Sequence, residues 1–431
     1  MFGIDFGTTN SSVARTDEQG RVQLVQFPAA SGLVAAYRSL LYLEQTKTRT
    51  RSQLHSWSGP EGIERYLAAE PKGRLIQSLK SYLSSRTLTG TEVFGRRQLL
   101  EDLVARILGD LRKHAESYFG CSVHSATVGR PVHFVGADSE ADDAFALERL
   151  RDAFSRAGFT HVEFELEPVA AAYHYASTLA REELVLIGDF GGGTSDFSLL
   201  RLRPHALQRE ERTELLATSG VGLAGDAFDA RLVRHLVSPH LGAGTLEKSG
   251  DKTLVAVPNW VYVRLEHWHH LSFLRTRAVS EMLRAARIRA FEPEKIAALS
   301  ELIDADLGYQ LHQAVQRTKV ALSQQEHAEF TFNDHGFHLQ AAVTRADFES
   351  WIQPDLTAIE QAIAEVMTTS GVDDASVDRI FLTGGSSLVP AVRRIFEHRF
   401  GPDRVRTGNE FTSVASGLAL RARASQRALI A

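Results

Sequence analysis

One pattern occurs twice in this chain, 184 residues apart: an apolar strand ending in Asp-Phe, a glycine turn and a second strand. The first copy is Phe2–Phe6, which holds Asp5 and is followed by Gly7-Thr8-Thr9. The second is Leu184–Phe190, which holds Asp189 and is followed by Gly191-Gly-Gly-Thr194. A repeat of this kind predicts two related lobes. For one copy alone, an ordinary hairpin with an exposed Asp is the alternative interpretation.

Strands and helices alternate around both copies, which predicts an α/β fold. Further strands are expected at residues 12–15, 22–27, 125–134, 162–166, 196–202, 214–219 and 379–382. Helices are expected at residues 99–119, 143–157, 169–180 and 414–424. A further helix is expected to begin near residues 389–390, and residues 259–338 are expected to be mostly helical. Proline-rich linkers and low-complexity segments are absent from the sequence.

Composition excludes several classes of protein. The 431 residues carry a formal net charge of −5, which does not favour a nucleic-acid partner, and Cys121 is the single cysteine. The sequence has neither a signal-peptide pattern nor an apolar run of about 18 residues, so we expect a cytoplasmic protein without a membrane partner. The segment with Trp260 and His267-Trp268-His269-His270 has no known zinc spacing, and packed helical histidines are expected there.

The glycine turns suit a polyphosphate. Turns of this kind expose several backbone N–H donors, and Asp5, Asp189 and Asp196 supply the carboxylates that magnesium prefers. A third glycine turn, Leu382-Thr-Gly-Gly-Ser-Ser387, follows a further apolar strand and would allow a flat ligand to approach the backbone. No Walker A motif is present to suggest another type of phosphate site.

Three stretches then resemble one family. MFGIDFGTTNS, IGDFGGGTSDFSLL and FLTGGSSLVPAVRRIF resemble the phosphate-one, phosphate-two and adenosine motifs of the actin-like ATPases, and look closest to the heat-shock 70 kDa chaperones. Glu167-Pro-Val-Ala-Ala-Ala172 is similar to that family's connecting segment, and Gly222-Leu-Ala-Gly-Asp-Ala-Phe-Asp229 to its second-lobe glycine turn. The resemblance covers nearly the whole chain.

The resemblance implies an α/β fold with two ribonuclease-H-like lobes around a nucleotide cleft. Lobe I would span 1–182, with an outer subdomain at about 39–114 and with 407–431 returning to it. Lobe II would span 183–406, with an enlarged outer subdomain at about 223–340.

It also implies roles for individual residues. Asp5 and Asp189 would hold hydrated Mg²⁺, and Pro131 would lie near the interlobe switch. Residues with catalytic roles would be Lys80, Glu167, Asp189, Asp196 and Thr194. Nucleotide-binding residues would be Gly7, Thr8, Thr9, Asn10, Gly191, Gly192, Gly193, Thr194, Gly225, Lys319, Ser323, Gly384, Gly385, Ser386 and Leu388. The alternatives are a solvated helix face for Lys80, a strand-end turn partner for Asp196 and ordinary helix-surface positions for Lys319 and Ser323.

The chain departs from the family's pattern in two places. Leu388 stands where the family usually has Arg, and Gln316 and Val320 replace a Glu and an Arg, which implies a less polar base pocket and looser base selectivity. Beyond the 414–424 helix we find no counterpart of the family's peptide-binding sandwich, so we expect a member similar to the short, YegD-type homologues.

The resemblance implies an ATP-binding, slowly hydrolysing chaperone-type ATPase with ATP or ADP and Mg²⁺ as ligands; it does not identify clients or co-chaperones. A filament-forming actin-like ATPase and a nucleotide sensor that barely hydrolyses ATP are the alternatives.

Overall fold

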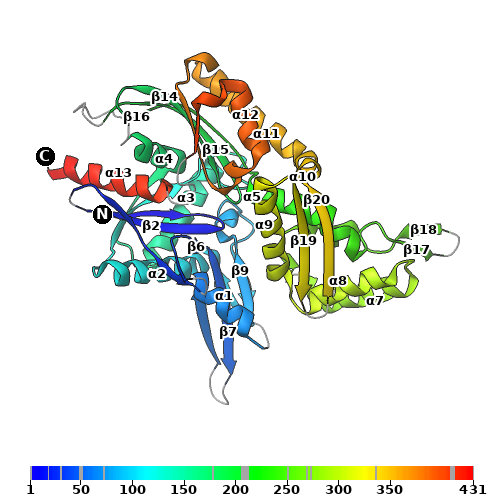
Figure 1. Cartoon of the computed structure of the whole chain (residues 1–431). Coiled ribbons are helices and arrows are strands. Elements are labelled where there is room, and N and C mark those ends of the chain that lie inside the picture. The colour runs from blue at the N-terminus through cyan, green and yellow to red at the C-terminus, as the bar shows by residue number, and fades with distance from the viewer. Residues whose placement is uncertain are drawn as a thin grey trace. The chain divides into compact units, whose positions relative to one another are not determined.

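The computed structural model describes residues 2–430 except 18, 30–31, 48–51, 71–72, 177–178, 205–212, 250–251, 268–269, 272–273, 335–336 and 408–412 (Figure 1). The chain forms two compact units. The first unit comprises Met1–Ala224, Ala358–Leu388 and Val392–Ala431, and the second comprises Gly225–Thr357 and Val389–Ala391. The predicted boundaries of lobes I and II differ from this division and remain a prediction.

The first unit contains two sheets with the same strand arrangement. One has the order β13-β12-β1-β2-β3, and the other has the order β16-β15-β14-β21-β22. In each, the strand with the repeated Asp, β1 or β14, is antiparallel to the next strand and parallel to a strand from much later in the sequence. The repeat in the sequence is therefore confirmed as a repeat of the fold.

The strands of the first sheet are β1 (Phe2–Phe6), β2 (Asn10–Thr16), β3 (Val22–Leu24), β12 (Ser125–Arg130) and β13 (His161–Leu166), with β6 (Tyr37–Arg38) also paired to β2. Those of the second are β14 (Glu183–Phe190), β15 (Ser195–Leu202), β16 (Thr213–Val221), β21 (Arg379–Thr383) and β22 (Val405–Thr407).

Helices cover both sheets of this unit. Helices α2 (Leu100–Phe119) and α3 (Glu140–Arg156) bury an apolar stripe in one core with β1, β2 and β12. On the second sheet, Phe396 of α12 (Pro390–Phe400) packs edge-on against the ring of Phe190.

Two further helices of the first unit pair with each other, and each packs on one of the sheets. Helix α13 (Ser413–Ile430), red in Figure 1, lies along β1 and β2, while α4 (Glu167–Ala176) lies against β14 and β15. Their backbones touch at Gly417, where an added methyl group would lie 1.6 Å from the carbonyl oxygen of Ala170. Thr16 Oγ1 also donates to the carbonyl of Ala419 at 2.7 Å. The two sheets are thus joined through this helix pair.

The rest of the first unit consists of smaller elements. These are β4 (Phe27–Ala29), β5 (Gly32–Val34), β7 (Leu40–Lys47), β8 (Ser52–Ser58), α1 (Gly59–Ala68), β9 (Arg74–Gln77), the 3₁₀ turn η1 (Leu79–Tyr82), β10 (Gly90–Val93), β11 (Arg96–Leu99), and the turns η5 (Asp374–Ser376), η6 (Gly385–Leu388) and η7 (Pro402–Arg404).

The second unit is mainly helical and contains two hairpins. Its helices are α5 (Gly225–Leu232), η2 (Val233–Val237), η3 (Ser238–Leu241), α6 (Asn259–Glu266), α7 (Arg277–Arg289), α8 (Pro293–Asp304), α9 (Gly308–Gln324) and α10 (Arg345–Trp351), and α11 (Gln353–Ser370) begins there. The hairpins are β17 (Leu246–Ser249) with β18 (Lys252–Val255), and β19 (His327–Asp334) with β20 (Phe337–Thr344).

Three predicted elements differ from the structure. The expectation of helix up to residue 338 is wrong from 327 on, because Phe330 and Phe332 alternate with polar residues and are buried as in a strand. The strand expected at 125–134 ends at Arg130, since Pro131 has no N–H to pair. The strand expected at 22–27 is split between β3 and β4. The helix predicted at 169–180 is observed over Glu167–Ala176 as α4; residues 177–178 lie outside the described part, and residues 179–180 are not helical.

Candidate functional site

The two repeated aspartates occupy equivalent positions in the two sheets of the first unit. Asp5 is the penultimate residue of β1 and pairs in register with Ser12 of β2. Asp189 is the penultimate residue of β14 and pairs with Asp196 of β15. A glycine turn follows each strand, so each half of the repeat supplies one carboxylate and one set of exposed backbone donors.

The two glycine turns lie next to each other. A methyl group added at Gly193 would lie 3.5 Å from Thr8 Oγ1, although these residues belong to different sheets. A methyl group at Gly7 would lie 2.2 Å from the carbonyl oxygen of Asn10, so the first turn requires glycine there. The second turn is closed by a bond from Gly191 N to the carbonyl of Thr194 at 2.9 Å. The structure therefore brings the predicted phosphate residues 7–10 and 191–194 together.

Lys80 and Glu167 form a buried ion pair. Lys80 lies in η1, Glu167 is the first residue of α4, and Nζ lies 2.5 Å from Oε1. Only 6% of Lys80 and 8% of Glu167 are exposed, so the interpretation of Lys80 as a solvated helix-face residue is wrong. Such a pair requires close partners, since a buried charge without one is strongly destabilising.

Four carboxylates surround this one lysine. Burial, and then the charges of Glu167, Asp5 and Asp196, raise the pKa of Asp189 well above its ordinary range, against the opposing effect of Lys80. Burial and the charge of Glu167 raise the pKa of Asp5 to about 7. Burial alone would lower the pKa of Lys80, but the charges of Glu167 and Asp5 raise it. The cluster is therefore short of positive charge.

Asp196 belongs to the same cluster and is also bound to a backbone donor. Its carboxylate accepts a hydrogen bond from Val132 N at 3.1 Å and another from the side chain of Thr194. Burial and the charge of Glu167 raise its pKa to about 7 despite these bonds. Asp196 thus combines a strand-end hydrogen-bonding position with a place in the acidic cluster.

The raised pKa of Asp196 predicts how the stability of the metal-free, nucleotide-free protein depends on pH. Because its pKa rises on folding from 3.8 to about 7, the folded state binds a proton that the unfolded state releases, and the resulting stability is lost as pH rises towards 7. Between pH 5 and pH 8, Asp196 should cost the wild type about 3 kcal/mol of unfolding free energy. We expect this part of the decrease to be absent in Asp196→Asn, and urea unfolding at the two pH values measures it.

Asp378→Asn is the matched control for this measurement. Despite partial burial, hydrogen bonds from Leu184 N and Arg181 hold the pKa of Asp378 below its ordinary value, so this group is charged in both states above pH 5. In Asp378→Asn, the difference in unfolding free energy between pH 5 and pH 8 should equal that of the wild type. Equal pH profiles for wild type and Asp196→Asn would contradict the prediction.

The third glycine turn meets the end of β14. Gly384 has φ +85°, and an added methyl group there would lie 2.0 Å from the carbonyl oxygen of Phe190, so only glycine fits. Ser387 Oγ donates to the carbonyl of Gly384 at 2.6 Å and closes the turn. Gly384, Gly385 and Ser386 therefore lie beside the strand that carries Asp189, and Leu388 is 48% exposed.

The remaining predicted residues lie in the second unit. Lys319 Nζ donates to the carbonyl of Gly225 at 3.0 Å and lies 2.7 Å from Asp229 Oδ1. Ser323 Oγ donates to the carbonyl of Lys319 at 3.0 Å. Gly225, Lys319 and Ser323 thus contact residues of their own unit. That they also bind a nucleotide stays a prediction.

Sequence reasoning missed the loop that follows Pro131. Val132 N binds Asp196, and Val135 Cγ2 would lie 3.4 Å from a methyl group on Gly193. The loop is held by Asp143, whose carboxylate accepts from Phe134 N at 2.8 Å and contacts His133 Nδ1 at 2.7 Å. Pro131 was the one signal in the sequence that could have predicted this loop, because a proline ends strand pairing directly after β12.

Within the described residues, no three His, Cys, Asp or Glu side chains lie close enough to hold a metal ion directly. In the histidine segment, the rings of His267 and His270 are 5.5 Å apart, and Trp268 and His269 lie outside the described residues. The surplus of carboxylates around Lys80 nevertheless fits a divalent cation that keeps its water ligands and is bound mainly through phosphate.

The duplicated sheets, with an aspartate and a glycine turn on each, define the actin-like ATPase fold. The family profile described as Hsp70 protein matches residues 78–255 and 295–427. The chain belongs to the Hsp70 family.

Individual relatives are similar over nearly the whole chain. The chaperone protein DnaK of Thermosipho africanus is 26% identical over 432 residues, covering 98% of this chain and 58% of the relative. The chaperone protein DnaK of Thermus thermophilus is 26% identical over 432 residues, covering 97% and 60%. The chain thus spans about 60% of the length of these relatives. In the described part of the chain, no helix is both long and apolar enough to cross a bilayer.

Proposed function

We propose that this chain binds ATP and ADP with Mg²⁺ and hydrolyses ATP slowly, as a chaperone-type ATPase. The observation that carries the proposal is the buried Lys80–Glu167 pair placed among Asp5, Asp189 and Asp196, beside two adjoining glycine turns. Membership of the Hsp70 family and the similarity to chaperones named DnaK support it.

The backbone donors of the turns 7–10 and 191–194 bind the phosphates, with Thr8, Thr9 and Thr194 adding hydroxyl groups. Asp5 and Asp189 would hold the hydrated metal ion, which would neutralise part of the phosphate charge. Within the first unit, Gly384, Gly385, Ser386 and Leu388 line the adenosine.

Lys80 stabilises negative charge that develops on the terminal phosphate during hydrolysis. Glu167 keeps that lysine charged and fixes its position through the 2.5 Å contact. Asp196 accepts a hydrogen bond from the attacking water and orients it, while Val132 N holds the carboxylate in place.

Calorimetric titration with ADP and with ATP, each with and without Mg²⁺, tests the proposal. We expect binding of both nucleotides that weakens at least about tenfold when EDTA removes the metal, because the carboxylate cluster then repels the phosphates. The absence of heat with either nucleotide at millimolar concentration would contradict it.

A single-turnover assay of phosphate release completes the test. Release that depends on Mg²⁺ supports the ATPase; tight binding without release identifies a nucleotide sensor instead. Sedimentation with ATP separates a third possibility, since polymer that grows with protein concentration identifies a filament-forming ATPase.

A further inference from the structure

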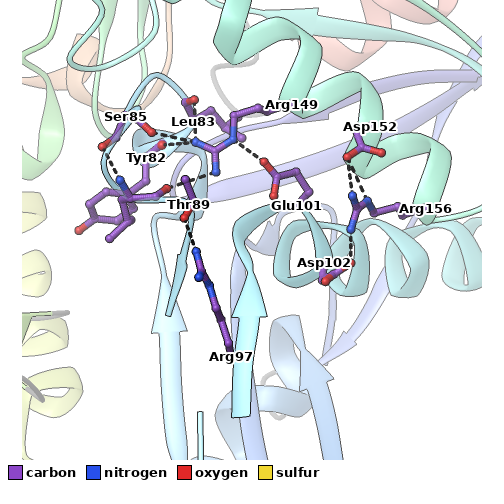
Figure 2. Close-up of polar contacts among 11 residues, drawn as sticks. Tyr82, Leu83, Ser85, Thr89, Arg97, Glu101, Asp102, Arg149, Asp152 and Arg156 are labelled. Atoms are coloured by element: carbon purple, nitrogen blue, oxygen red, sulfur yellow. Dashed lines mark hydrogen bonds and ion pairs between the residues drawn. The ribbon is translucent and has the colours of Figure 1, made fainter. Parts of the chain in front are cut away.

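Arg149 of α3 is buried and binds one short segment of backbone. Its exposed fraction is 6%, and its Nε pairs with the Glu101 carboxylate of α2. The guanidinium also donates to four carbonyl oxygens, those of Tyr82 (3.3 Å), Leu83 (3.1 Å), Ser85 (3.0 Å) and Leu88 (3.2 Å). Figure 2 shows this segment curved around the guanidinium group.

The segment bound by Arg149 comes directly after Lys80. Residues 83–89 form neither helix nor strand, so their carbonyl groups have no ladder of their own. Buried backbone groups must nevertheless be paired, and the planar guanidinium offers five donors in a fixed geometry. Arg149 thus binds four carbonyl groups of 82–88, where the chain leaves η1, and adds to the local bonds from Ser85 N to the Tyr82 carbonyl and from Leu88 N to Ser85 Oγ.

The same segment also contacts the loop at the acidic cluster. Ser84 Oγ donates to the carbonyl of Val135 at 2.5 Å, and Val135 borders Gly193. Asp143, six residues before Arg149 on α3, holds the other side of this loop through Phe134 N. Helix α3 therefore fixes both the segment after Lys80 and the loop that binds Asp196.

We infer that Arg149 is a positioning residue that keeps Lys80 against Glu167 by holding the 82–88 backbone in its native shape. The expected effect of Arg149 on hydrolysis rests on the proposed function. Its expected effect on the position of Lys80 rests on the structure alone. Arg149 itself donates hydrogen bonds to Glu101 and to the backbone, and its guanidinium lies 5.4 Å from the centre of the Phe145 ring.

The test compares Arg149→Met with Arg156→Met. Arg156 is a matched control because it lies on the same helix and ion-pairs with Asp102, the residue next to Glu101, and with Asp152, without binding the 82–88 segment (Figure 2). Both substitutions remove a guanidinium that bridges α3 to α2. Only Arg149→Met removes the backbone contacts.

Two measurements do not depend on hydrolysis. In Arg149→Met we expect faster hydrogen exchange of the amides of 82–88, and acetylation of Lys80 by an amine-reactive reagent rising towards that of Lys113, whose side chain is 72% exposed. Arg156→Met should change neither. Unchanged exchange and unchanged Lys80 labelling in Arg149→Met, or equal changes in both variants, would overturn the inference.

The kinetic expectation is a split between kcat and nucleotide affinity. In Arg149→Met, kcat should fall about tenfold to a hundredfold because Lys80 is misplaced, while the Kd for Mg-ADP changes less than about threefold. A loss confined to affinity would overturn the inference. A wild-type protein that binds nucleotide but releases no phosphate would refute the proposed ATPase, and the Lys80 labelling would still decide the role of Arg149.

Arg149→Lys gives the second variant if Arg149→Met does not fold. A lysine keeps the charge near Glu101 but cannot donate to four carbonyls in the planar arrangement. We expect it to retain the fold with fast exchange in 82–88 and reduced kcat. Full rescue by Arg149→Lys would show that charge alone matters and would overturn the inference.

Discussion

Replacing Asp189 with Asn is expected to abolish Mg²⁺-dependent ATP hydrolysis while the protein stays folded. The substitution keeps the volume of the side chain and removes one of the two repeated carboxylates that we propose hold the hydrated metal. Loss of a preorganised charge at the reacting group costs at least about a hundredfold in turnover. Steady-state phosphate release with and without Mg²⁺ measures this.

Stability should change in the opposite direction. Because burial and three neighbouring carboxylates raise the pKa of Asp189, its charged form is unfavourable in the metal-free protein. A neutral Asn relieves that repulsion, so the melting temperature at pH 8 with EDTA should not fall below that of wild type.

Asp378→Asn is the matched control for Asp189→Asn. Asp378 accepts a hydrogen bond from Leu184 N at 2.9 Å, near the end of β14 opposite to Asp189. That variant should hydrolyse ATP at the wild-type rate. Normal Mg²⁺-dependent hydrolysis by Asp189→Asn would show that the metal assignment is wrong.

Lys80→Met is expected to reduce kcat by about a hundredfold to a thousandfold, with a smaller effect on nucleotide affinity. Methionine preserves most of the aliphatic packing but removes the cation that we place at the terminal phosphate. The substitution also leaves the Glu167 carboxylate buried without its partner, which should cost about 3–5 kcal/mol of unfolding free energy. Single-turnover kinetics and urea unfolding measure the two effects separately.

The double variant Lys80→Met with Glu167→Gln separates structure from catalysis. Neutralising the orphaned carboxylate should restore most of the lost stability, and hydrolysis should remain low because the cation is still missing. Recovery of hydrolysis in the double variant, or unchanged kcat in Lys80→Met, would remove Lys80 from the mechanism.

The sequence predicted the parts of the fold that have local signals. The two strand–Asp–glycine-turn copies, the long amphipathic helix that became α2 and the tight third turn at Gly384 all depend on periodicity or on glycine at a close approach. The β19–β20 hairpin was missed because it follows a long helical region, although Phe330 and Phe332 alternate as strand residues do.

The site was less predictable because its pairings are long-range. Glu167 lies 87 residues from Lys80, and Asp196 binds Val132 across 64 residues, so spacing along the chain carries no information about either contact. The segment around Lys80 offered only a weak motif, and its burial depends on Arg149, a residue that sequence reasoning did not single out. Family resemblance pointed to Lys80 and Glu167, but not to the network that holds them.

The close contact between α13 and the first sheet has a consequence for biosynthesis. The face of that sheet that carries Gly3 and Ala14 is covered by Ala415 and Ala419, about 400 residues later in the chain. A ribosome needs roughly 20–80 s to synthesise that length, and during this time the first sheet can be completed only on its other face. The nascent protein therefore exposes this face of the first sheet until translation reaches α13, which makes the docking of α13 the step that completes the sheet.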